Sequence, residues 1–118
     1  MTKDEFLTEY KTGQRQFIDI ELENIDLSGE DLSNIEFKEC FLSVDFQKCN
    51  LSNSKFINGN IKTCDFRHSD LTESLFEKVA IEGTRFKDAI TTSLIFKNNY
   101  CFGTIVSQDD FEQNICNF

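Results

Sequence analysis

The sequence predicts an all-β solenoid, and three observations support this: a five-residue hydrophobic period, thirteen phenylalanines and no proline. Apolar residues recur about every 3.6 positions on a helix face and about every 2 on a strand face, so a period of five fits neither element. The period instead indicates a chain that turns a corner every five residues and stacks its coils on one another. Proline is disfavoured there because each short segment donates its backbone N–H to a neighbouring coil.

The five-residue period runs through most of the chain. Every fifth residue from Phe17 to Leu42 is Leu or Phe, and the series resumes at Phe46 and continues to Phe86 as Leu, Phe or Ile. After Phe46, the position two residues before each of these centres is small or β-branched. The two positions therefore predict two inward side chains on each side of a coil, one large and one small.

One residue is missing from the period between Phe37 and Phe46, and we place the loss within 38–43. Either Phe41 or Leu42 could then point inward. We favour Leu42, with Cys40 as its small partner, and we interpret the shortened repeat as a tightened corner rather than a functional site.

Several segments resemble the pentapeptide repeat family, in which a small residue, Asp or Asn, and Leu or Phe are followed by two further residues. Examples are Ile25-Asp26-Leu27-Ser28-Gly29, Cys49-Asn50-Leu51-Ser52-Asn53, Cys64-Asp65-Phe66-Arg67-His68 and Ser69-Asp70-Leu71-Thr72-Glu73. The resemblance covers about 17–118. It implies a right-handed quadrilateral parallel β-helix of about five coils, with about twenty residues in each coil.

We therefore divide the chain into a cap segment, 1–15, and a pentapeptide-repeat β-helix domain, 16–118. In the cap segment, Thr2 could begin a short helix that places Phe6, Leu7 and Tyr10 on one face and ends near Gly13. Such a helix would cover the open end of the first coil. Binding of a partner is the alternative role for this segment.

Nothing in the sequence indicates catalysis, and we predict no enzyme activity, cofactor or metal site. The five cysteines lie on inward positions without C-x-x-C spacing, so we expect them to fill the core. Unpaired buried thiols are typical of a reducing compartment, which favours a cytoplasmic location. No apolar run is long enough for a membrane span, and the first residues do not resemble a secretory signal. His68, the only histidine, is expected at an outward corner.

The formal charge of −9 argues against direct nucleic-acid binding, which needs a basic surface. Residues 1–40 hold eleven acidic and four basic residues, a net charge of −7. This acidity could serve solubility and keep solenoid edges apart. It could also form an acidic face for a basic partner, made of Asp19, Glu21, Glu23, Asp26, Glu30 and Asp31.

Some members of the family that the chain resembles protect or inhibit topoisomerases by mimicking DNA, so the resemblance also implies this function. Five coils at about 4.8 Å would span about 25 Å. Duplex DNA of that length carries about 15 charges, more than the net −9 of this chain. We therefore keep a DNA-mimic regulator only as the alternative function.

Towards the C-terminus, outward positions become apolar. At a twenty-residue repeat, Leu75, Ile95 and Ile115 would form one external stripe, with Tyr100 beside it. Either the register slips near 88–90 and turns these residues inward, or they form an interface. We favour an interface and expect a homodimer through the C-terminal coils. The predicted function is a non-enzymatic protein-interaction or scaffold module with an unidentified protein partner.

Overall fold

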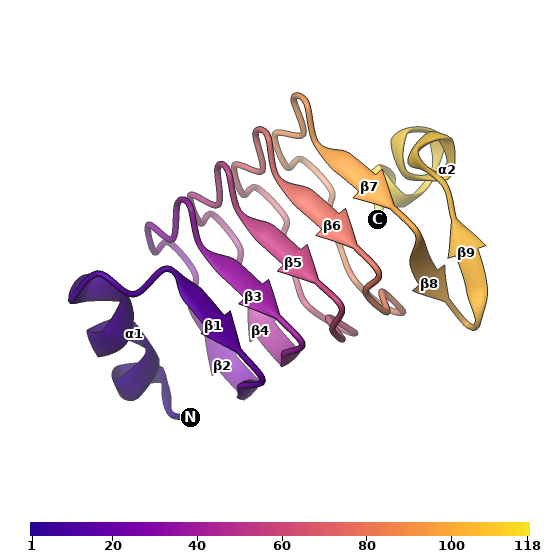
Figure 1. The fold of residues 1–118 in the computed structure, drawn as a ribbon. Coiled ribbons are helices and arrows are strands. Elements are labelled where there is room, and N and C mark those ends of the chain that lie inside the picture. Colours follow the sequence, from indigo (N-terminus) through magenta and orange to yellow (C-terminus); the bar gives the residue numbers. More distant parts are fainter.

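The computed structural model describes all residues from Met1 to Phe118 and contains a parallel β-solenoid closed by a helix at each end (Figure 1). The right-handed quadrilateral β-helix expected from the repeat is confirmed, but it has about four turns rather than about five. The first helix, α1 (Lys3–Lys11), covers one end. A hairpin, the helix α2 (Gln108–Gln113) and a short 3₁₀ helix (Ile115–Asn117) occupy the other end.

One side of the solenoid is a five-stranded parallel sheet, visible as the row of arrows in Figure 1. Its strands in spatial order are β1 (Gln16–Ile18), β3 (Glu36–Lys38), β5 (Lys55–Ile57), β6 (Leu75–Glu77) and β7 (Ile95–Lys97). A second side pairs β2 (Glu21–Asp26) with β4 (Phe41–Asp45). Isolated parallel bridges continue this pairing from β4 into the later coils and join the coils on the remaining side. The only antiparallel pair is β8 (Asn99–Cys101) with β9 (Thr104–Val106).

The core consists of the predicted centres of the repeat. All fifteen centres from Phe17 to Phe86 are at most 4% exposed. The ring of Phe66 stacks between those of Phe46 and Phe86, with centroids 5.1 and 5.3 Å away, and the Phe56 and Phe76 rings stack at 4.8 Å. The two aromatic columns meet edge to face, an arrangement that aromatic rings favour. Phenylalanines twenty residues apart therefore stack on one another, as coils of about twenty residues imply.

All corners of the solenoid but one use a residue with left-handed backbone, two positions after the centre. Fourteen of these residues are not glycine. The corner after Leu42 lacks such a residue, because β4 continues without a turn through Ser43 and Val44. The paired strand β2 has one more residue here, Asn24, which has no partner in β4. The missing residue thus lies next to Ser43, at the end of the segment 38–43 in which the sequence placed it, and the corner is straightened rather than tightened.

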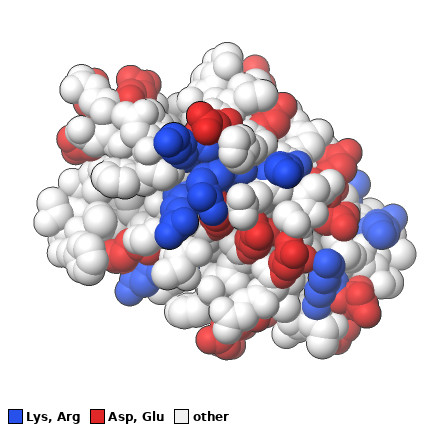
Figure 2. Space-filling model, turned by 180° about the vertical axis from the view of Figure 1, so that it is seen from behind, with Lys and Arg blue, Asp and Glu red and all other residues white.

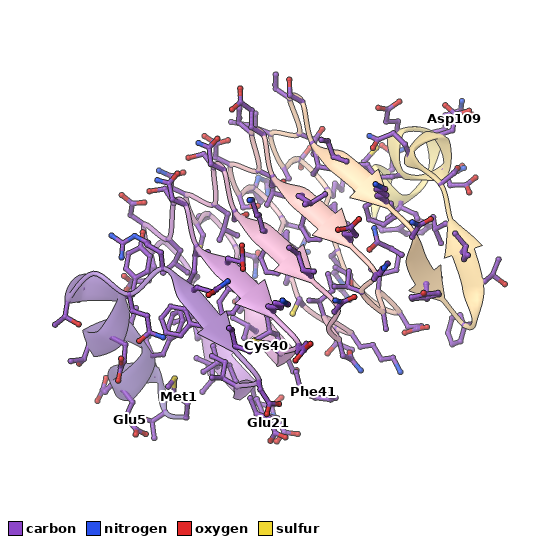
Figure 3. The ribbon with its side chains drawn as sticks, viewed as in Figure 1. Met1, Glu5, Glu21, Cys40, Phe41 and Asp109 are labelled. Carbon is purple, nitrogen blue, oxygen red and sulfur yellow. The ribbon has the colours of Figure 1, made fainter.

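The choice between the two candidate inward residues at the shortened repeat is also settled. Leu42 is 1% exposed and Cys40 is 4% exposed, whereas Phe41 is 44% exposed. Figure 3 shows the Phe41 side chain projecting away from the ribbon at the start of β4. The predicted assignment of Leu42 and Cys40 to the core is therefore confirmed.

The Asp and Asn residues that precede many centres have a backbone role. Their side-chain oxygen accepts a hydrogen bond of 2.9–3.1 Å from the N–H two residues later, as in an Asx turn. The residues concerned are Asp26, Asp31, Asp45, Asn50, Asn60, Asp65 and Asp70. Five of the 21 acidic residues therefore have a role in the backbone of the corners.

Polar side chains at the small inward position, two residues before each centre, donate hydrogen bonds to carbonyl groups of the preceding coil. Thr84 donates to the carbonyl of Ile61 at 3.0 Å, and the cysteines at three such positions donate in the same way to centres 22 or 23 residues earlier. Asn99, which is fully buried, donates to Phe76 O at 2.8 Å and accepts from Val79 N at 3.0 Å. Burying these polar groups is tolerated because each has a partner.

Ser74 lacks such a partner, and we expect Ser74→Ala to raise the free energy of unfolding by about 1 kcal/mol. Its buried hydroxyl oxygen forms no hydrogen bond, so alanine removes an uncompensated polar group. Ser69→Ala is the matched control, because the Ser69 hydroxyl donates to Phe66 O at 2.6 Å. That variant should lose about 1 kcal/mol. Urea denaturation measures both, and equal shifts for the two variants would contradict the prediction.

Gly59 is required by a close approach between coils, and Gly59→Ala should cost about 1–3 kcal/mol. A Cβ at this position would lie 2.6 Å from the carbonyl oxygen of Cys40. That same oxygen accepts the ladder hydrogen bond of Asn60 N at 2.9 Å, so the coils would have to separate. Because the clash is with backbone, adding Cys40→Ala should not relieve it. Urea denaturation of the single and double variants tests this; full rescue by Cys40→Ala would overturn the explanation.

The helix α1 closes the first coil, as the sequence predicted. Thr2 and Glu5 form a capping box at its start. The fully buried Phe6 extends the aromatic column, with its ring centroid 4.8 Å from that of Phe17, and the Tyr10 hydroxyl donates to Ser33 O at 2.8 Å. The cap thus supplies both an apolar cover and a hydrogen bond to the first coil.

At the other end, the chain leaves the solenoid after Tyr100, so the predicted coils beyond this point are wrong. The Gln108 side chain takes the place of a peptide of the next coil: its Oε1 accepts from Phe96 N at 2.7 Å and its Nε2 donates to Leu94 O at 3.1 Å. Phe111, 1% exposed, covers the last phenylalanines. The edge of β7 is therefore closed from within the chain.

Candidate interaction sites

No group of three or more His, Cys, Asp or Glu side chains is placed to hold a metal ion. The single histidine, His68, is exposed at a corner, and its Nε2 lies 4.0 Å from a carboxylate oxygen of Asp88. No helix has the length and apolar character needed to cross a membrane.

The predicted acidic residues lie on the first coil, but they follow its path around successive sides. Glu21 and Glu23 belong to β2, and Asp19 occupies the preceding corner with left-handed backbone. Asp26 and Asp31 accept the backbone hydrogen bonds of two Asx turns. Hydrogen bonds from Ser28 lower the pKa of Asp26. Glu30 is half-buried. These six residues surround a coil, and two of them have a structural reason to be acidic.

The predicted apolar stripe is only partly present. Leu75 and Ile95 are neighbours on β6 and β7, and Ile95 is 54% exposed whereas Leu75 is half-buried. Ile115 does not continue this stripe, because it lies on the 3₁₀ helix, half-buried against the core. The predicted alternative, a register slip near 88–90, is also wrong: Ile90 is 54% exposed. Phe96 keeps the inward register at 2% exposure.

The hairpin β8–β9 carries three exposed apolar side chains, including the most exposed large apolar residue of the chain, Phe102. Tyr100 pairs with Ile105 across the hairpin; they are 39% and 60% exposed. At the tip, Phe102 is 84% exposed and, like the following Gly103, has positive φ, 49° and 77° respectively. Positive φ at both turn residues favours Asn-Gly, and a bulky side chain at the first position costs about 1–2 kcal/mol. We call Tyr100, Phe102 and Ile105 the apolar hairpin surface.

A basic pocket, which the sequence analysis missed, lies where the last coil ends. It has a volume of about 590 Å³ and contains three basic residues and no acidic residue among those that line it. Its basic residues are Arg67, Arg85 and Lys87, and Ile81 and Ile115 contribute apolar surface. Figure 2 shows Lys and Arg atoms gathered near the middle of the face opposite to the view in Figure 1.

The pocket forms because no further coil covers the last centres. Ile81 N still donates to Tyr100 O, but the chain then turns away into the hairpin. It returns at Phe118, whose carbonyl oxygen accepts hydrogen bonds from Phe86 N at 2.6 Å and Lys87 N at 2.5 Å. The space between the coil and the returning segment is the pocket. With about twenty residues in each coil, Arg67 and Lys87 lie next to each other on adjacent coils. The sequence could therefore have predicted that basic residues gather at this pocket.

Two of the pocket cations are free of ion pairs. Arg67 forms a two-pronged ion pair with Asp65, with Nη2 2.7 Å from Oδ2 and Nε 3.0 Å from Oδ1. Burial raises the pKa of Asp65, but the hydrogen bonds and charge of Arg67 and the charge of Arg85 outweigh it and leave the pKa lowered. Arg85 and Lys87 take part in no ion pair. The side chains that line the pocket therefore include two cations without a carboxylate side-chain partner.

The five cysteines fall into two classes. Cys40, Cys49 and Cys64 are buried, and burial raises the pKa of each thiol, to about 11 for Cys49 and to about 12 for Cys64. Cys101 and Cys116 are partly exposed. All five are free thiols, and the predicted role as core filler holds for the three buried ones.

Thiol labelling should follow this division. Because the thiolate is the reactive form, we expect iodoacetamide at about pH 8 to modify Cys101 and Cys116 in the folded chain and to leave Cys40, Cys49 and Cys64 unmodified. Peptide mass spectrometry after a short reaction identifies the labelled positions. Labelling in urea, where all five should react, is the control. Rapid modification of Cys64 in the native chain would show that the last coils open readily.

Comparison with known proteins agrees with the fold. Residues 41–72 and 49–88 match the family described as pentapeptide repeats, with eight copies. No curated protein sequence matches the chain, and no catalytic family is indicated.

Two solved structures share the architecture. One is HetL, a pentapeptide repeat protein involved in heterocyst differentiation regulation from the cyanobacterium Nostoc, with 21% identity, 84% of this chain and 44% of that chain covered, and a TM-score of 0.71. The other is QnrB1, a plasmid-mediated fluoroquinolone resistance protein, with 22% identity, 73% of this chain and 47% of that chain covered, and a TM-score of 0.64. The chain thus spans less than half the length of either protein. The matched repeats show that residues 41–88 consist of pentapeptide repeats, and the chain shares the β-helix fold of these two proteins.

Proposed function

We propose that the chain is a non-enzymatic protein-binding module that uses the apolar hairpin surface, Tyr100, Phe102 and Ile105, to contact its partner. The observation that carries this proposal is Phe102, which is 84% exposed and has a φ of 49°. A large apolar side chain at a strained and exposed turn position contributes nothing to the core. Strain of this kind is often kept where it serves binding.

The hairpin is also well placed to bind, because it projects from the end of a rigid solenoid (Figure 1). Its first strand is anchored by the fully buried Asn99, so the tip is held in one position relative to the coils. A pre-ordered apolar tip loses little conformational entropy on binding. The partner is a protein, and a second copy of the chain is one form it could take. The three buried free thiols support a cytoplasmic location for this interaction.

Phe102→Asn separates binding from folding. Asparagine is preferred at this turn position, so the variant should be at least as stable as the original chain, with a gain of up to about 1–2 kcal/mol. It should nevertheless fail to retain the partner in affinity capture from the source cells, and any dimer should become a monomer by light scattering. Ile90→Asn is the matched control, since it removes a similarly exposed apolar side chain from another side. Identical capture and mass for all three chains would refute the proposal.

The alternative, a DNA-mimic regulator, receives less support from the surface. The longest dimension is 37 Å, and duplex DNA of that length carries about 22 charges, against a net −9 here. The basic pocket further interrupts the negative surface. The likeness to QnrB1 concerns the fold alone at 22% identity. A DNA gyrase supercoiling assay tests this alternative directly, and we expect no effect of the chain.

A further inference from the structure

We propose that the partner binds the hairpin β8–β9 as an extended strand, which pairs with the free edge of β9 and packs on the apolar hairpin surface. This inference rests on the proposed function, because it names the kind of segment that this surface contacts. The strand β9 is the last strand of its sheet, and Figure 1 shows no further element beside it at the C-terminal end of the solenoid. Thr104 and Ile105 in this strand are exposed.

The backbone of Ile105 points away from the hairpin. Its partner across the hairpin is Tyr100, and both polar backbone groups of Tyr100 bond to the preceding coil. The N–H of Tyr100 donates to Val79 O and its carbonyl accepts from Ile81 N, each at 2.9 Å. In an antiparallel pair, opposite residues either bond to each other or both direct their groups outward. Ile105 therefore directs its N–H and C=O to the outer side of β9, where an added strand would find one donor and one acceptor.

The side chains around this edge lack the charges by which proteins often discourage the pairing of edge strands. Residues 98–107 contain no charged side chain, although 28% of the chain is charged. By contrast, the outer edge of β2 carries Glu21 and Glu23. The edge of β7 is closed by the Gln108 side chain. The edge of β9 differs from both, because it is open and uncharged.

The surroundings of this edge also define the chemistry of the partner strand. The residue opposite Ile105 would lie on the same face of the sheet as Ile105 and Tyr100, which are 60% and 39% exposed. An apolar and preferably β-branched residue at that position would pack best on these side chains. Asp109 and Glu112 are exposed on α2, which follows β9, and two copies of a chain with net charge −9 repel each other. The partner strand is therefore an uncharged or basic segment of another protein.

Ile105→Pro tests the edge without disturbing the hairpin. Proline removes only the N–H that faces solvent, and an edge strand tolerates proline in this orientation. Thr104→Pro is the contrasting variant, because the N–H of Thr104 faces its hairpin partner, Cys101. Hydrogen exchange should show a protected Cys101 amide in Ile105→Pro and a loss of this protection in Thr104→Pro. The Ile105 amide of the original chain should exchange rapidly, unlike that of Tyr100, and this measurement needs no variant.

The probe for binding is a phage-displayed library of random short peptides, selected against the original chain. We expect enriched sequences with apolar residues at alternate positions and few acidic residues. Synthetic copies of these peptides should bind Ile105→Pro at least about tenfold more weakly than Ile105→Ala, because a peptide carbonyl loses its donor. Ile105→Ala is the matched control, since it shortens the side chain but keeps the N–H. Peptide binding should also slow the exchange of the Ile105 amide in the original chain.

The proposal is overturned if no binding peptide is enriched, if both Ile105 variants bind the peptides equally, or if the Ile105 amide is already protected in the free chain. A dimer that Ile105→Pro dissociates would also overturn it, because a second copy would then occupy the edge. Failure of the proposed function looks different, since Phe102→Asn would then retain the partner as the original chain does. If Phe102→Asn loses the partner but Ile105→Pro retains it, the proposed function stands and strand pairing is excluded.

Discussion

Phe66→Ala is expected to lower the free energy of unfolding by about 3–5 kcal/mol. The Phe66 side chain is fully buried, and its ring contacts four others: it stacks on Phe46 and Phe86 and meets Phe56 and Phe76 edge to face, at 5.5 Å or less. Alanine would leave a cavity that the rigid ladders above and below cannot fill by collapse. Both the transfer of the ring from water and its contacts would be lost.

Two controls define this prediction. Phe66→Leu keeps most of the volume and should cost less than Phe66→Ala by at least half. Phe41→Ala removes the same ring from a position that is 44% exposed, and should change stability by about 0.5 kcal/mol or less. The measurement is urea denaturation followed by circular dichroism. A similar loss for Phe41→Ala and Phe66→Ala would mean that the aromatic columns do not dominate the stability of the solenoid.

Phe111→Ala is expected to release the C-terminal cap and to cost about 3–5 kcal/mol if the cap unfolds together with the coils. Phe111 belongs to α2 and is 1% exposed, and its ring lies 4.8 Å from that of Phe96 and 5.1 Å from that of Phe86. When α2 detaches, the Gln108 side chain no longer bonds to Phe96 N and Leu94 O. The edge of β7 then becomes open to other chains.

Hydrogen exchange gives the specific readout for Phe111→Ala. The amide of Phe96 should exchange much faster, while that of Phe56, which lies two coils away in the same sheet, should be less affected. Light scattering should detect self-association of the uncovered end. Gln113→Ala, an exposed position on the same helix, is the control and should behave like the original chain. Unchanged protection of Phe96 in Phe111→Ala would show that α2 does not close the solenoid.

The interior of this protein could be predicted from the sequence because its positions repeat. From Phe17 to Phe86, each centre must fill the same place in a coil, so a single pattern of Leu, Phe and Ile identifies the core and the register. The slip near Leu42 was recognised for the same reason. The helix α1 was also predictable, since the capping box of Thr2 and Glu5 is a local signal.

The structure of the C-terminal end could not be predicted from the five-residue period. Continuing the period beyond Tyr100 predicted another coil, with Ile115 above Ile95, but α2 and the 3₁₀ helix occupy this region. The decisive contacts are those of Gln108 with Leu94 and Phe96, and of Phe118 with Phe86 and Lys87. They join segments that no repeat relates, so periodicity carries no information about them.

The sequence by itself determined the solenoid, its inward columns and its N-terminal cap, because burial in a repeating backbone allows few residue types at each inward position. Only the tertiary structure decided where the coils stop, that Phe102 is exposed at a strained turn, and that Arg67, Arg85 and Lys87 line one pocket. The physical reason is that outward residues and end caps are not constrained by the repeat. Their environment depends on how the returning C-terminal segment packs against the last coil.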